Sequence, residues 1–404
     1  MTMITLTDID VRSPEFYRNP YPFYRLLREQ DPVHHIAELG VWLVTRHDLV
    51  TEVFADQRRF GKTWPEGTAP LDGPRPEEFA ALDEIPVDML DSDPPDHTRL
   101  RRLVSKAFTP KAVEQQRPRI AEIVDELIDE MLGKPRFDLV RDFAIPIPVR
   151  IIGEILGVPA GDYTRFQNWT VDFVRSFDVT QPQEVKYKGM AAHLKLVEYF
   201  DELVRERRVA PGPDLISSLI KVEDEGDKLS RGDLLAMCVL MLFGGYETTF
   251  TLISNGTRLL LEHKEQRELL LARPELARQA CEELVRYESP VQRIGYIARY
   301  DQEFGGKSLR KGDVVLACIG AANRDPAVFE EPDRLALDRS NTKQIAFGRG
   351  LHYCIGAPLA VLEAAVAIPR LLERVPRLTI LDETLDWAPT SAHRRLQSLT
   401  ASAG

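Results

Sequence analysis

The sequence predicts a mainly α-helical protein with small β-sheets, an α+β fold class that rests on three observations. Most segments of the 404-residue chain place apolar residues three and four positions apart, the period of a helix with one buried face. Runs with the alternation of strands are few and short. No repeat, low-complexity tract or Gly/Ser-rich linker separates two cores, so we expect a single domain over residues 1–404.

The expected elements follow this periodicity along the chain. Helices are expected over residues 20–30, 97–107, 113–132, 148–157, 161–176, 189–207, 229–262, 275–288 and 357–374. Strands are expected over residues 41–45, 295–299, 313–318 and 377–381. The segments 62–96 and 319–347 carry Pro and Asp without a clear period, and long irregular segments in compact enzymes are often functional.

The segment 229–262 predicts one long buried helix. Ser230 can cap its N-terminus, with Asp233 three residues later as the second member of a capping box. About 34 residues at a rise of about 1.5 Å give a helix of about 50 Å, long enough to cross the whole protein. Residues 234–243 are apolar nearly all round, which indicates burial on every side.

Composition excludes several classes of function. The formal net charge of −11 argues against nucleic acid or an anionic membrane as the main partner. No run reaches the ~18 consecutive apolar residues of a membrane span, and the N-terminal residues lack the pattern of a signal peptide, so we expect a cytoplasmic protein. Cys238, Cys281 and Cys318 lie in apolar periodic segments typical of inert core cysteines. No two cysteines have CxxC spacing, which argues against a zinc site or disulfide framework.

The fourth cysteine, Cys354, lies in residues 347–356, which read FGRGLHYCIG. The glycines before it allow a tight loop, Gly356 allows the same after it, and Pro358 suits the first turn of the next helix. A thiolate there would face backbone N–H donors and a positive helix end, which lower a thiol pKa. A plain glycine-rich turn is the alternative; a zinc site through His352 and Cys354 lacks two further close ligands.

A second pattern, GGYET, occupies residues 244–248 midway along the long helix. Two adjacent glycines in a helix interior cost about 1 kcal/mol each relative to alanine. A close helix crossing would explain the glycines, but it would not explain the acid Glu247 in an apolar stretch. Thr248 can hydrogen-bond the carbonyl of Gly244, four residues back.

Two further pairs have the spacing of neighbours on one helix face. Glu283 and Arg286 are three apart, and His97 and Arg101 are four apart at the start of another helix. Taken alone, the first pair is typical of a surface ion pair and the second of a polar helix start.

Together these segments resemble the bacterial, soluble class of the cytochrome P-450 superfamily. Residues 347–356 match its haem-binding signature FGxGxHxCxG, residues 244–248 match its oxygen-activation motif, and the resemblance runs from about residue 15 to the C-terminus. It implies a single P-450-type domain with a long central helix across a buried haem b, whose iron is ligated by Cys354. Thiolate ligation donates electron density to haem iron and favours O–O cleavage.

The resemblance also assigns roles to side chains. Glu247 would relay protons inward and Thr248 would steer them to bound O2. The cofactor-binding residues would be His97, Arg101, Phe347, Gly348, His352, Cys354 and Gly356, to which we add Tyr296 on separate grounds. Glu283 and Arg286 would form a buried structural network with a later arginine, for which Arg334 has the expected place; Leu335 replaces the usual phenylalanine after it.

Tyr296 is a departure from the family, since many bacterial members carry arginine on this strand beside the haem. Arg293 and Arg299 lie at odd offsets from Tyr296, and side chains alternate faces along a strand, so both should point away from it. We therefore expect the Tyr296 phenol to donate to a haem propionate. Most of the positive charge there would come from His97, Arg101 and His352.

The substrate pocket implied by the resemblance is largely apolar. Its expected residues are Val87, Met89, Leu90, Phe173, Leu240, Met241, Phe243, Gly244, Val291 and Ile294. Arg293 or Arg394 could meet an acid or hydroxyl, or face solvent. A secondary metabolite, a terpenoid or steroid, and a fatty acid all stay open.

The expected function is that of a haem-thiolate monooxygenase, which inserts one oxygen atom of O2 into a small substrate by hydroxylation or epoxidation. Oxidative coupling and a catalytically silent haem scaffold are the alternatives. Only about 50 residues follow Cys354 and no cysteine cluster is present, so we expect electrons from a separate ferredoxin or flavodoxin with its reductase. We also expect a monomer. Four cations form either its docking patch or an ordinary solvated face: Arg99, Arg102, Lys106 and Arg349.

Overall fold

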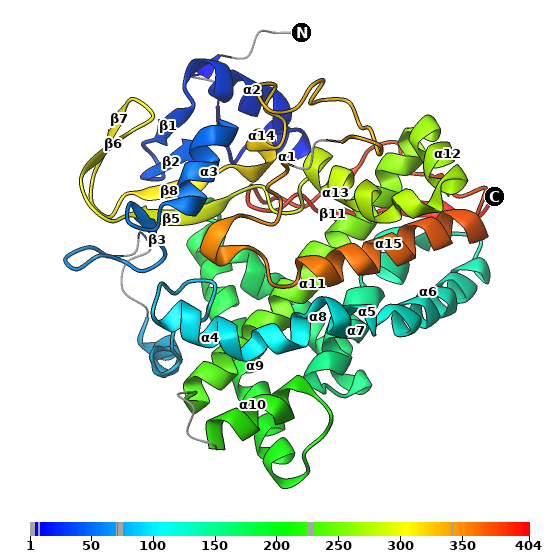
Figure 1. The fold of residues 1–404 in the computed structure, drawn as a ribbon, viewed down its shortest axis with the longest axis horizontal. Helices are drawn as coiled ribbons and strands as arrows, with labels where there is room; N and C mark the ends of the chain where they lie inside the picture. Colours follow the sequence, from blue (N-terminus) through cyan, green and yellow to red (C-terminus); the bar gives the residue numbers. More distant parts are fainter. Residues whose placement is uncertain (1–4, 7–8, 70, 72–75, 225–228, 341–342) are drawn as a thin grey trace.

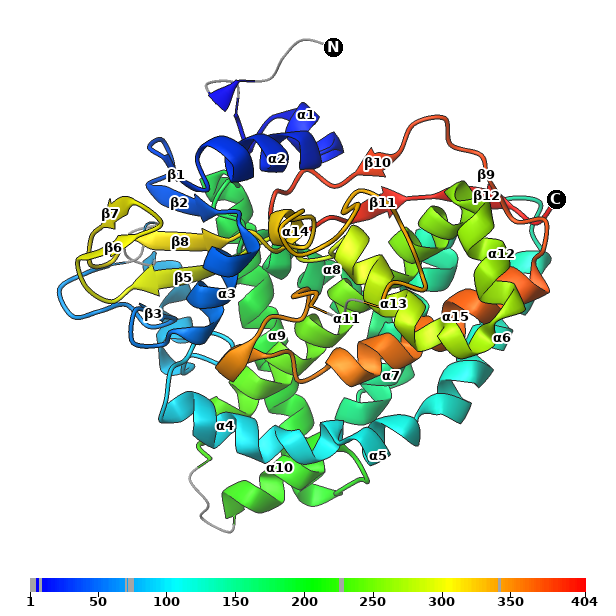
Figure 2. The ribbon, with the colours of Figure 1, turned by 45° about the horizontal axis from the view of Figure 1, so that its top comes forward.

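The structure is a computed structural model, and it describes residues 5–6, 9–69, 71, 76–224, 229–340 and 343–404. The described chain is mainly helical, with a sheet-rich region at one side and the helices stacked beside it (Figures 1 and 2). The helices are α1 (Pro14–Arg18), α2 (Tyr21–Gln30), α3 (His47–Ala55), α4 (Asp96–Val104), α5 (Pro110–Glu114), α6 (Arg117–Leu132), α7 (Pro146–Leu156), α8 (Tyr163–Arg175), α9 (Gln183–Val209), α10 (Leu215–Asp224), α11 (Arg231–Glu262), α12 (Lys264–Ala272), α13 (Ala277–Tyr287), α14 (Ile319–Ala322) and α15 (Ala357–Arg374).

Short 3₁₀ and π segments connect several of these helices. They cover Glu77–Glu84, Ser105–Phe108, Leu139–Ala144, Ala160–Asp162, Pro274–Leu276 and Gly350–His352. The strands are β1 (Val33–Ile36), β2 (Val41–Val44), β3 (Phe60–Gly61), β4 (Phe137–Asp138), β5 (Ile294–Ala298), β6 (Gln302–Phe304), β7 (Lys307–Leu309), β8 (Val314–Ala317), β9 (Thr379–Ile380), β10 (Asp386–Trp387), β11 (Leu396–Ser398) and β12 (Thr400–Ser402).

The largest described sheet has the strand order β1-β2-β8-β5-β3. β2 and β8 are parallel, whereas the other neighbours are antiparallel, and Tyr296 of β5 pairs with Val315 of β8. The valine-rich strands β2 and β8 are buried, as expected for branched side chains packed between layers. This sheet holds β5 and its Tyr296 against the helical part of the protein.

Helix α11 runs through the middle of the helical part and confirms the predicted long buried helix (Figure 1). Ser230 caps it: its Oγ accepts from the N–H of Asp233 at 3.0 Å, and the Asp233 carboxylate accepts from the N–H of Ser230 at 3.0 Å. By length and composition α11 alone among the described helices could span a membrane, but 83% of its apolar window is buried inside the protein. It is therefore the core helix of this fold.

All nine expected helices and all four expected strands are present, most with shifted ends, and α15 has the expected bounds. The helices that sequence reasoning missed include α3, α10 and α12, which are short, and α12 begins directly after the end of α11. The expected irregular segments contain an eight-residue 3₁₀ helix at Glu77–Glu84 and the short helix α14. Short elements escape periodicity because two turns contain too few apolar residues to define a face.

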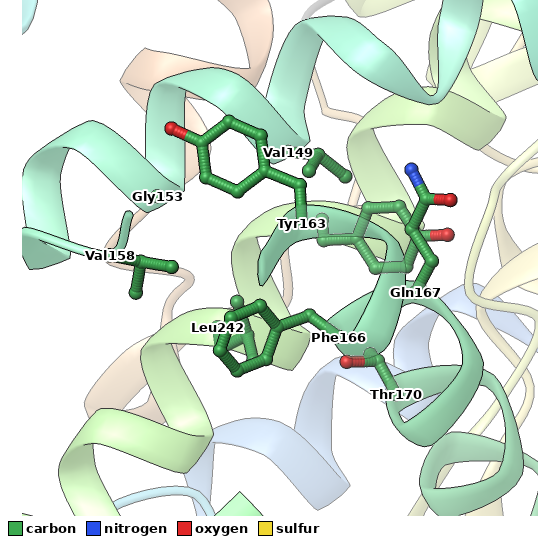
Figure 3. A pocket seen from close by; sticks show the side chains of 9 residues that line it. Val149, Gly153, Val158, Tyr163, Phe166, Gln167, Thr170 and Leu242 are labelled. Carbon is green, nitrogen blue, oxygen red and sulfur yellow. The ribbon is translucent and has the colours of Figure 1, made fainter. Parts of the chain in front are cut away.

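A small cavity of about 10 Å³ lies between α7, α8 and α11 (Figure 3). It is lined by Tyr163, Phe166, Thr170 and Tyr246, among others. The Thr170 hydroxyl is buried there without a partner among the described residues. The volume suits about one water and no organic ligand, so this cavity is not the functional site.

Candidate active site

A cavity of about 500 Å³ lies where α4, α11, β5 and the loop before α15 meet. This volume is in the range of small-molecule and cofactor sites. Segments far apart in the sequence contribute to its walls, and most of the lining side chains are apolar. The predicted site residues that line it are Met89, Leu90, His97, Arg101, Leu240, Met241, Phe243, Gly244, Glu247, Thr248, Val291, Ile294, Tyr296, Phe347, Gly348, His352, Cys354 and Gly356.

Cys354 sits in a tight loop immediately before α15. Its backbone N–H donates to the carbonyl of Phe347 at 2.9 Å, which closes the loop. Gly348 and Gly350 have φ of +69° and +67°, a conformation that side chains other than glycine rarely adopt. A Cβ on Gly350 would also lie 3.0 Å from the carbonyl oxygen of Phe54. The backbone conformation of this loop therefore favours glycine at positions 348 and 350, as the predicted signature has it.

The Cys354 sulfur accepts from the N–H groups of Gly356 and Ala357, at the start of α15. Burial raises the pKa of this thiol, and the two N–H donors and Arg101 act in the opposite direction. The expectation of a lowered pKa is thus wrong in this structure, because desolvation outweighs the amide donors. A coordinated metal ion reverses that balance, since it deprotonates a ligating thiol outright.

Helix α11 presents Gly244, Gly245, Glu247 and Thr248 to the same cavity, whereas Tyr246 lines the small cavity beside α7 and α8. The Thr248 hydroxyl donates to the carbonyl of Gly244 at 3.1 Å, as predicted. A Cβ on Gly244 would meet nothing within 4 Å, whereas one on Gly245 would lie 3.2 Å from Ile152 of α7. Gly245 thus allows a close helix crossing, and Gly244 leaves open space on the cavity side.

Glu247 is buried on this wall, with 3% of its surface exposed. One carboxylate oxygen lies 3.1 Å from the Nε of Arg395, a residue from just before β11. The other oxygen, Oε2, has no hydrogen-bond partner among the described residues. Glu247 therefore keeps a free acceptor next to Thr248 at the cavity wall.

The residues predicted to bind the haem propionates lie together at the end of the cavity nearest α4 and β5. The rings of His97 and His352 lie 4.4 Å apart between centroids, and the Tyr296 ring lies 6.4 Å from that of His352. Both ring nitrogens of the fully buried His97 lack a partner within the described chain. Arg101 donates to the carbonyl of Tyr353 at 2.7 Å.

Burial lowers the pKa of His97 to about 4 and that of His352 to about 3. Both rings are therefore neutral near pH 7 in this structure and offer hydrogen-bond donors rather than charge. We expected the two histidines to supply positive charge at this end of the cavity, but in this structure burial favours their neutral form. Burial also raises the pKa of Tyr296 far above its usual range, so its phenol keeps its proton.

The two arginines near Tyr296 behave differently from each other. Arg299, which follows the last residue of β5, lies outside the cavity lining as predicted and binds Asp93 at 2.8 Å. Arg293 lines the cavity, contrary to that prediction, because it precedes the first residue of β5 and strand alternation does not govern it. It is buried, contacts Asp178 at 3.3 Å and donates to Ser391.

Two residues of the predicted substrate pocket do not line the cavity. Val87 is 58% exposed, because its irregular segment carries the side chain to the surface. Phe173 is buried one layer behind the wall, with its ring 5.3 Å from that of Phe243. Arg394 is likewise held elsewhere, by Glu288 at 2.8 Å.

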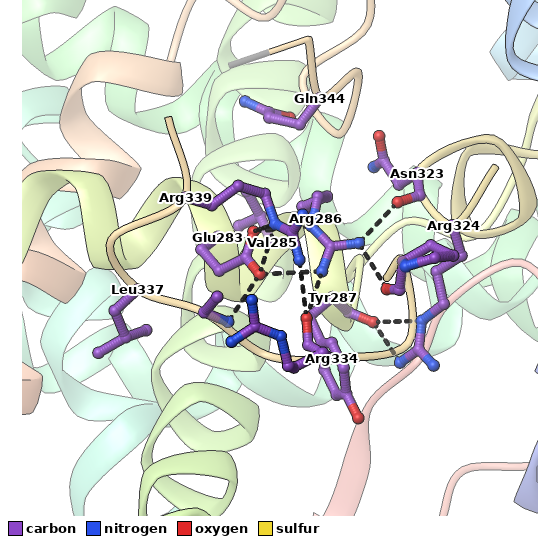
Figure 4. A network of polar contacts seen from close by, with 12 residues as sticks. Glu283, Val285, Arg286, Tyr287, Asn323, Arg324, Arg334, Leu337, Arg339 and Gln344 are labelled. Carbon is purple, nitrogen blue, oxygen red and sulfur yellow. Dashed lines mark hydrogen bonds and ion pairs between the residues drawn. The ribbon is translucent and has the colours of Figure 1, made fainter. Parts of the chain in front are cut away.

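The buried Glu283–Arg286 network is present, but the prediction of its third member was wrong (Figure 4). Arg286 binds the Glu283 carboxylate at 2.7 and 2.9 Å. The third guanidinium belongs to Arg339, whose Nε lies 3.2 Å from both carboxylate oxygens. The side chain of Arg334 is 60% exposed and pairs with Glu331, while only its backbone carbonyl accepts from Arg286. The irregular path of residues 331–339 brings the later arginine to Glu283.

The predicted basic patch is smaller than expected. Arg99 is held by Asp233 at 2.9 Å and by Asp96 at 3.2 Å, so its charge is neutralised. Arg102, Lys106 and Arg349 are exposed.

The cavity fits the haem that the sequence resemblance implies. It combines a thiol at a helix start, largely apolar walls, and an end with one arginine, two histidines and a tyrosine. The unpartnered ring nitrogens of His97 are the decisive observation, because buried polar groups in native proteins are nearly always hydrogen-bonded. A carboxylate such as a haem propionate would accept a hydrogen bond from the one N–H of the neutral His97 ring.

Comparison with known proteins decides the family. The family model described as cytochrome P450 matches residues 41–376. The chain belongs to the cytochrome P450 family. This P450 is 40% identical to the cytochrome P450 monooxygenase PikC of Streptomyces venezuelae over 403 residues, covering 97% of this chain and 93% of that protein. It is 41% identical to a vitamin D(3) 25-hydroxylase of Pseudonocardia autotrophica over 383 residues, covering 93% and 91%.

Solved structures agree with this P450 assignment. The crystal structure of P450BioI in complex with hexadec-9Z-enoic acid ligated acyl carrier protein matches with a TM-score of 0.88 at 36% identity, covering 96% of this chain and all of that one. The protein is therefore an oxidoreductase of the P450 monooxygenase type that binds haem through a cysteine thiolate. As a bacterial-type P450 it takes electrons from redox partners and acts on small molecules.

Sequence reasoning missed several polar residues of this P450 site, among them Lys62, Glu363 and Arg395. Lys62 and Glu363 line the cavity, and Arg395 contacts Glu247. Glu363 is 1% exposed with an unpartnered oxygen, and burial raises its pKa well above the usual range. Its place on the buried face of α15 was the signal that could have singled it out, because an isolated acid on an apolar face is unusual. Lys62 and Arg395 lie outside every recognisable pattern.

Replacing Tyr296 by phenylalanine should loosen the cofactor only slightly. A neutral hydrogen bond contributes about 0.5–1.5 kcal/mol, which corresponds to roughly a tenfold change or less in haem affinity. Arg101→Ala should have the larger effect, since charge-assisted bonds are about twice as strong. The measurement is the rate of haem transfer from each ferric variant to a haem-scavenging acceptor protein. Equal rates for the two variants would contradict the assignment.

Proposed function

We propose that this P450 inserts one oxygen atom of O2 into a largely apolar small organic substrate, by hydroxylation or epoxidation. The other oxygen atom leaves as water, using two electrons and two protons. The observation that carries the proposal is that Cys354, Glu247 and Thr248 line one cavity whose other walls are mainly apolar. One relative is a vitamin D(3) 25-hydroxylase. The compound in its name is apolar, which supports the proposal of an apolar substrate.

The haem, ligated by Cys354, would supply the oxygen-activating chemistry when bound. His97, Arg101, Tyr296 and His352 would bind its propionate groups, and Phe347 would pack beside it. Gly348 and Gly356, which have no side chains, leave room next to it. The substrate would contact Met89, Leu90, Leu240, Met241, Phe243, Val291 and Ile294. These apolar walls favour an apolar substrate because burying its surface removes it from water.

Glu247 and Thr248 would move the protons. Glu247 can receive a proton on Oε2, the oxygen that is not held by Arg395. The Thr248 hydroxyl, which donates to the carbonyl of Gly244, is one residue further along the same wall and would pass the proton on into the cavity. The position of both groups in a mainly apolar cavity restricts competing proton exchange with bulk water.

We further propose a cytoplasmic, monomeric enzyme with one domain over residues 1–404, reduced by a separate ferredoxin with its reductase. The exposed cations Arg102, Lys106 and Arg349 support a donor with an acidic face. A flavodoxin offers similar acidic chemistry and would dock on the same side.

Two measurements test the proposed function directly. A library of terpenoids, steroids, polyketides and fatty acids, titrated against the ferric protein, should contain apolar ligands that shift the Soret band. The reduced protein with such a ligand should consume O2 and form a product that is one oxygen atom heavier. A coupled product without added oxygen would indicate oxidative coupling, and no O2 consumption would indicate a silent scaffold.

Thr248→Ala should divert reducing equivalents from product to hydrogen peroxide. Positioned acid–base groups contribute about 10²–10⁴-fold, so a marked fall in product per electron is expected while substrate binding stays intact. The measurement compares NAD(P)H consumed, peroxide formed and product formed. Thr251→Ala is the matched control, since Thr251 donates to the Glu247 carbonyl one turn along α11 and does not line the cavity. Unchanged product per electron in Thr248→Ala would exclude the proposed role.

A further inference from the structure

Lys62 is a buried lysine at the end of the cavity that holds Tyr296. Lys62 is the first residue after β3, and it is 9% exposed. The Nζ atom donates to the carbonyl of Gly295 at 2.8 Å and lies 4.1 Å from the centre of the Tyr296 ring. An ammonium has three N–H donors, so this contact leaves donors of Lys62 for another acceptor.

The backbone of Lys62 is fixed by Asp93. The Asp93 carboxylate accepts from the N–H of Lys62 at 3.0 Å, from the N–H of Thr63 at 2.9 Å and from the Thr63 hydroxyl at 2.7 Å. Arg299 adds an ion pair to the same carboxylate at 2.8 Å. Gly61 makes this possible, because a Cβ there would lie 2.5 Å from the Arg299 side chain. These contacts hold Lys62 in a defined place at the cavity wall.

The charge of Lys62 has no close acidic partner. Within the described chain, no carboxylate lies within 4.0 Å of its Nζ, although Asp88, Asp91 and Asp93 act on it from further away. The side chain is buried, so its ammonium is poorly solvated, and this desolvation lowers the pKa of Lys62. A buried charge is costly unless it is paired and hydrogen-bonded, so this wall is complementary to an anionic ligand.

The other cations on the wall separate into two groups. Arg293 is already paired, with Asp178. Arg101 donates to a backbone carbonyl and, like Lys62, forms no ion pair with the residues that the structure describes. The cavity thus presents two unneutralised cations, Arg101 and Lys62, and haem b carries two propionate carboxylates.

We propose that Lys62 binds a haem propionate as a second cation beside Arg101, with the Tyr296 ring as a platform under its ammonium and Asp93 as its positioning residue. A cation over an aromatic ring gains further attraction when it is desolvated. The inference depends on haem binding, which the family shows, and not on the substrate or on the proton-delivery roles.

The test compares haem with its dimethyl ester, in which both propionates are neutral. Holoprotein of the wild type and of Lys62→Met is prepared with each cofactor, and transfer to a haem-scavenging acceptor protein is timed. Loss of a charge-assisted bond should make Lys62→Met release ordinary haem about 10- to 100-fold faster. The ester should leave both proteins at nearly the same rate, because its neutral groups cannot pair with Lys62.

Two control variants separate propionate binding from a purely structural role. Lys62→Arg keeps the charge and should retain haem nearly as well as the wild type. Lys311→Met removes the same charge from an exposed position and should leave both rates unchanged. If Lys62→Met is isolated without haem, retention of haem by Lys62→Arg still supports the proposal, and its loss there overturns it.

An equal acceleration of haem and ester release in Lys62→Met would show that Lys62 only supports the loop after β3. An unchanged rate for haem would show that it does not contact the cofactor. Either result overturns the proposal. Because the assay involves no turnover, neither result bears on oxygen insertion.

Discussion

Cys354→Ser should abolish the red-shifted Soret band of the ferrous–CO complex and reduce oxygen insertion to below detection. Serine presents a hard hydroxyl in place of a soft thiolate, and the electron donation that favours O–O cleavage is lost. The loop itself should survive, since its closing bond runs from the backbone N–H of residue 354 to the carbonyl of Phe347. The measurement is the CO difference spectrum of freshly prepared protein.

The matched control for this prediction is Cys281→Ser. Cys281 is buried on α13 and does not line the cavity, so the red-shifted band should persist. A thiolate-type spectrum in Cys354→Ser, or an imidazole-type spectrum in the folded wild type, would contradict the assignment of Cys354.

Arg286→Leu should prevent accumulation of folded haem protein, whereas Arg334→Ala should leave its stability and yield almost unchanged. Arg286 is 1% exposed and donates to Glu283 and to the carbonyls of Asn323 at 2.9 Å and Pro332 at 2.8 Å. Removing one partner of a buried ion pair costs about 3–5 kcal/mol of stability. The two backbone carbonyls would also lose their hydrogen-bond donor, which increases this cost. That is a large part of the roughly 5–15 kcal/mol that stabilise a typical fold.

The measurement is the free energy of unfolding, or the yield of haem-bearing protein where the variant does not fold. Arg334→Ala removes only a surface pair with Glu331, which contributes about 0–1 kcal/mol. Arg339→Ala should be clearly more harmful than Arg334→Ala, because Arg339 contacts the buried Glu283 carboxylate. The reverse order would restore the sequence-based choice of Arg334.

The sequence by itself determined the features whose partners lie close along the chain. The Ser230–Asp233 capping box and the bond from Thr248 to Gly244 join residues three or four apart, within one helix. The loop around Cys354 is closed by a bond to a residue seven positions earlier. Helical period and glycine chemistry decide such contacts, so pattern reasoning correctly predicted the two helix contacts and the tight loop, but not the bond that closes the loop.

Only the tertiary structure decided the contacts that cross the fold. Arg339 rather than Arg334 reaches Glu283 because residues 331–339 follow an irregular path that has no period to extrapolate. Lys62 reaches the cavity because the β3–β5 pairing brings its loop against Gly295 and Tyr296, more than 230 positions later. Contacts between distant segments depend on how packed elements and irregular connections meet, and no local spacing records that information.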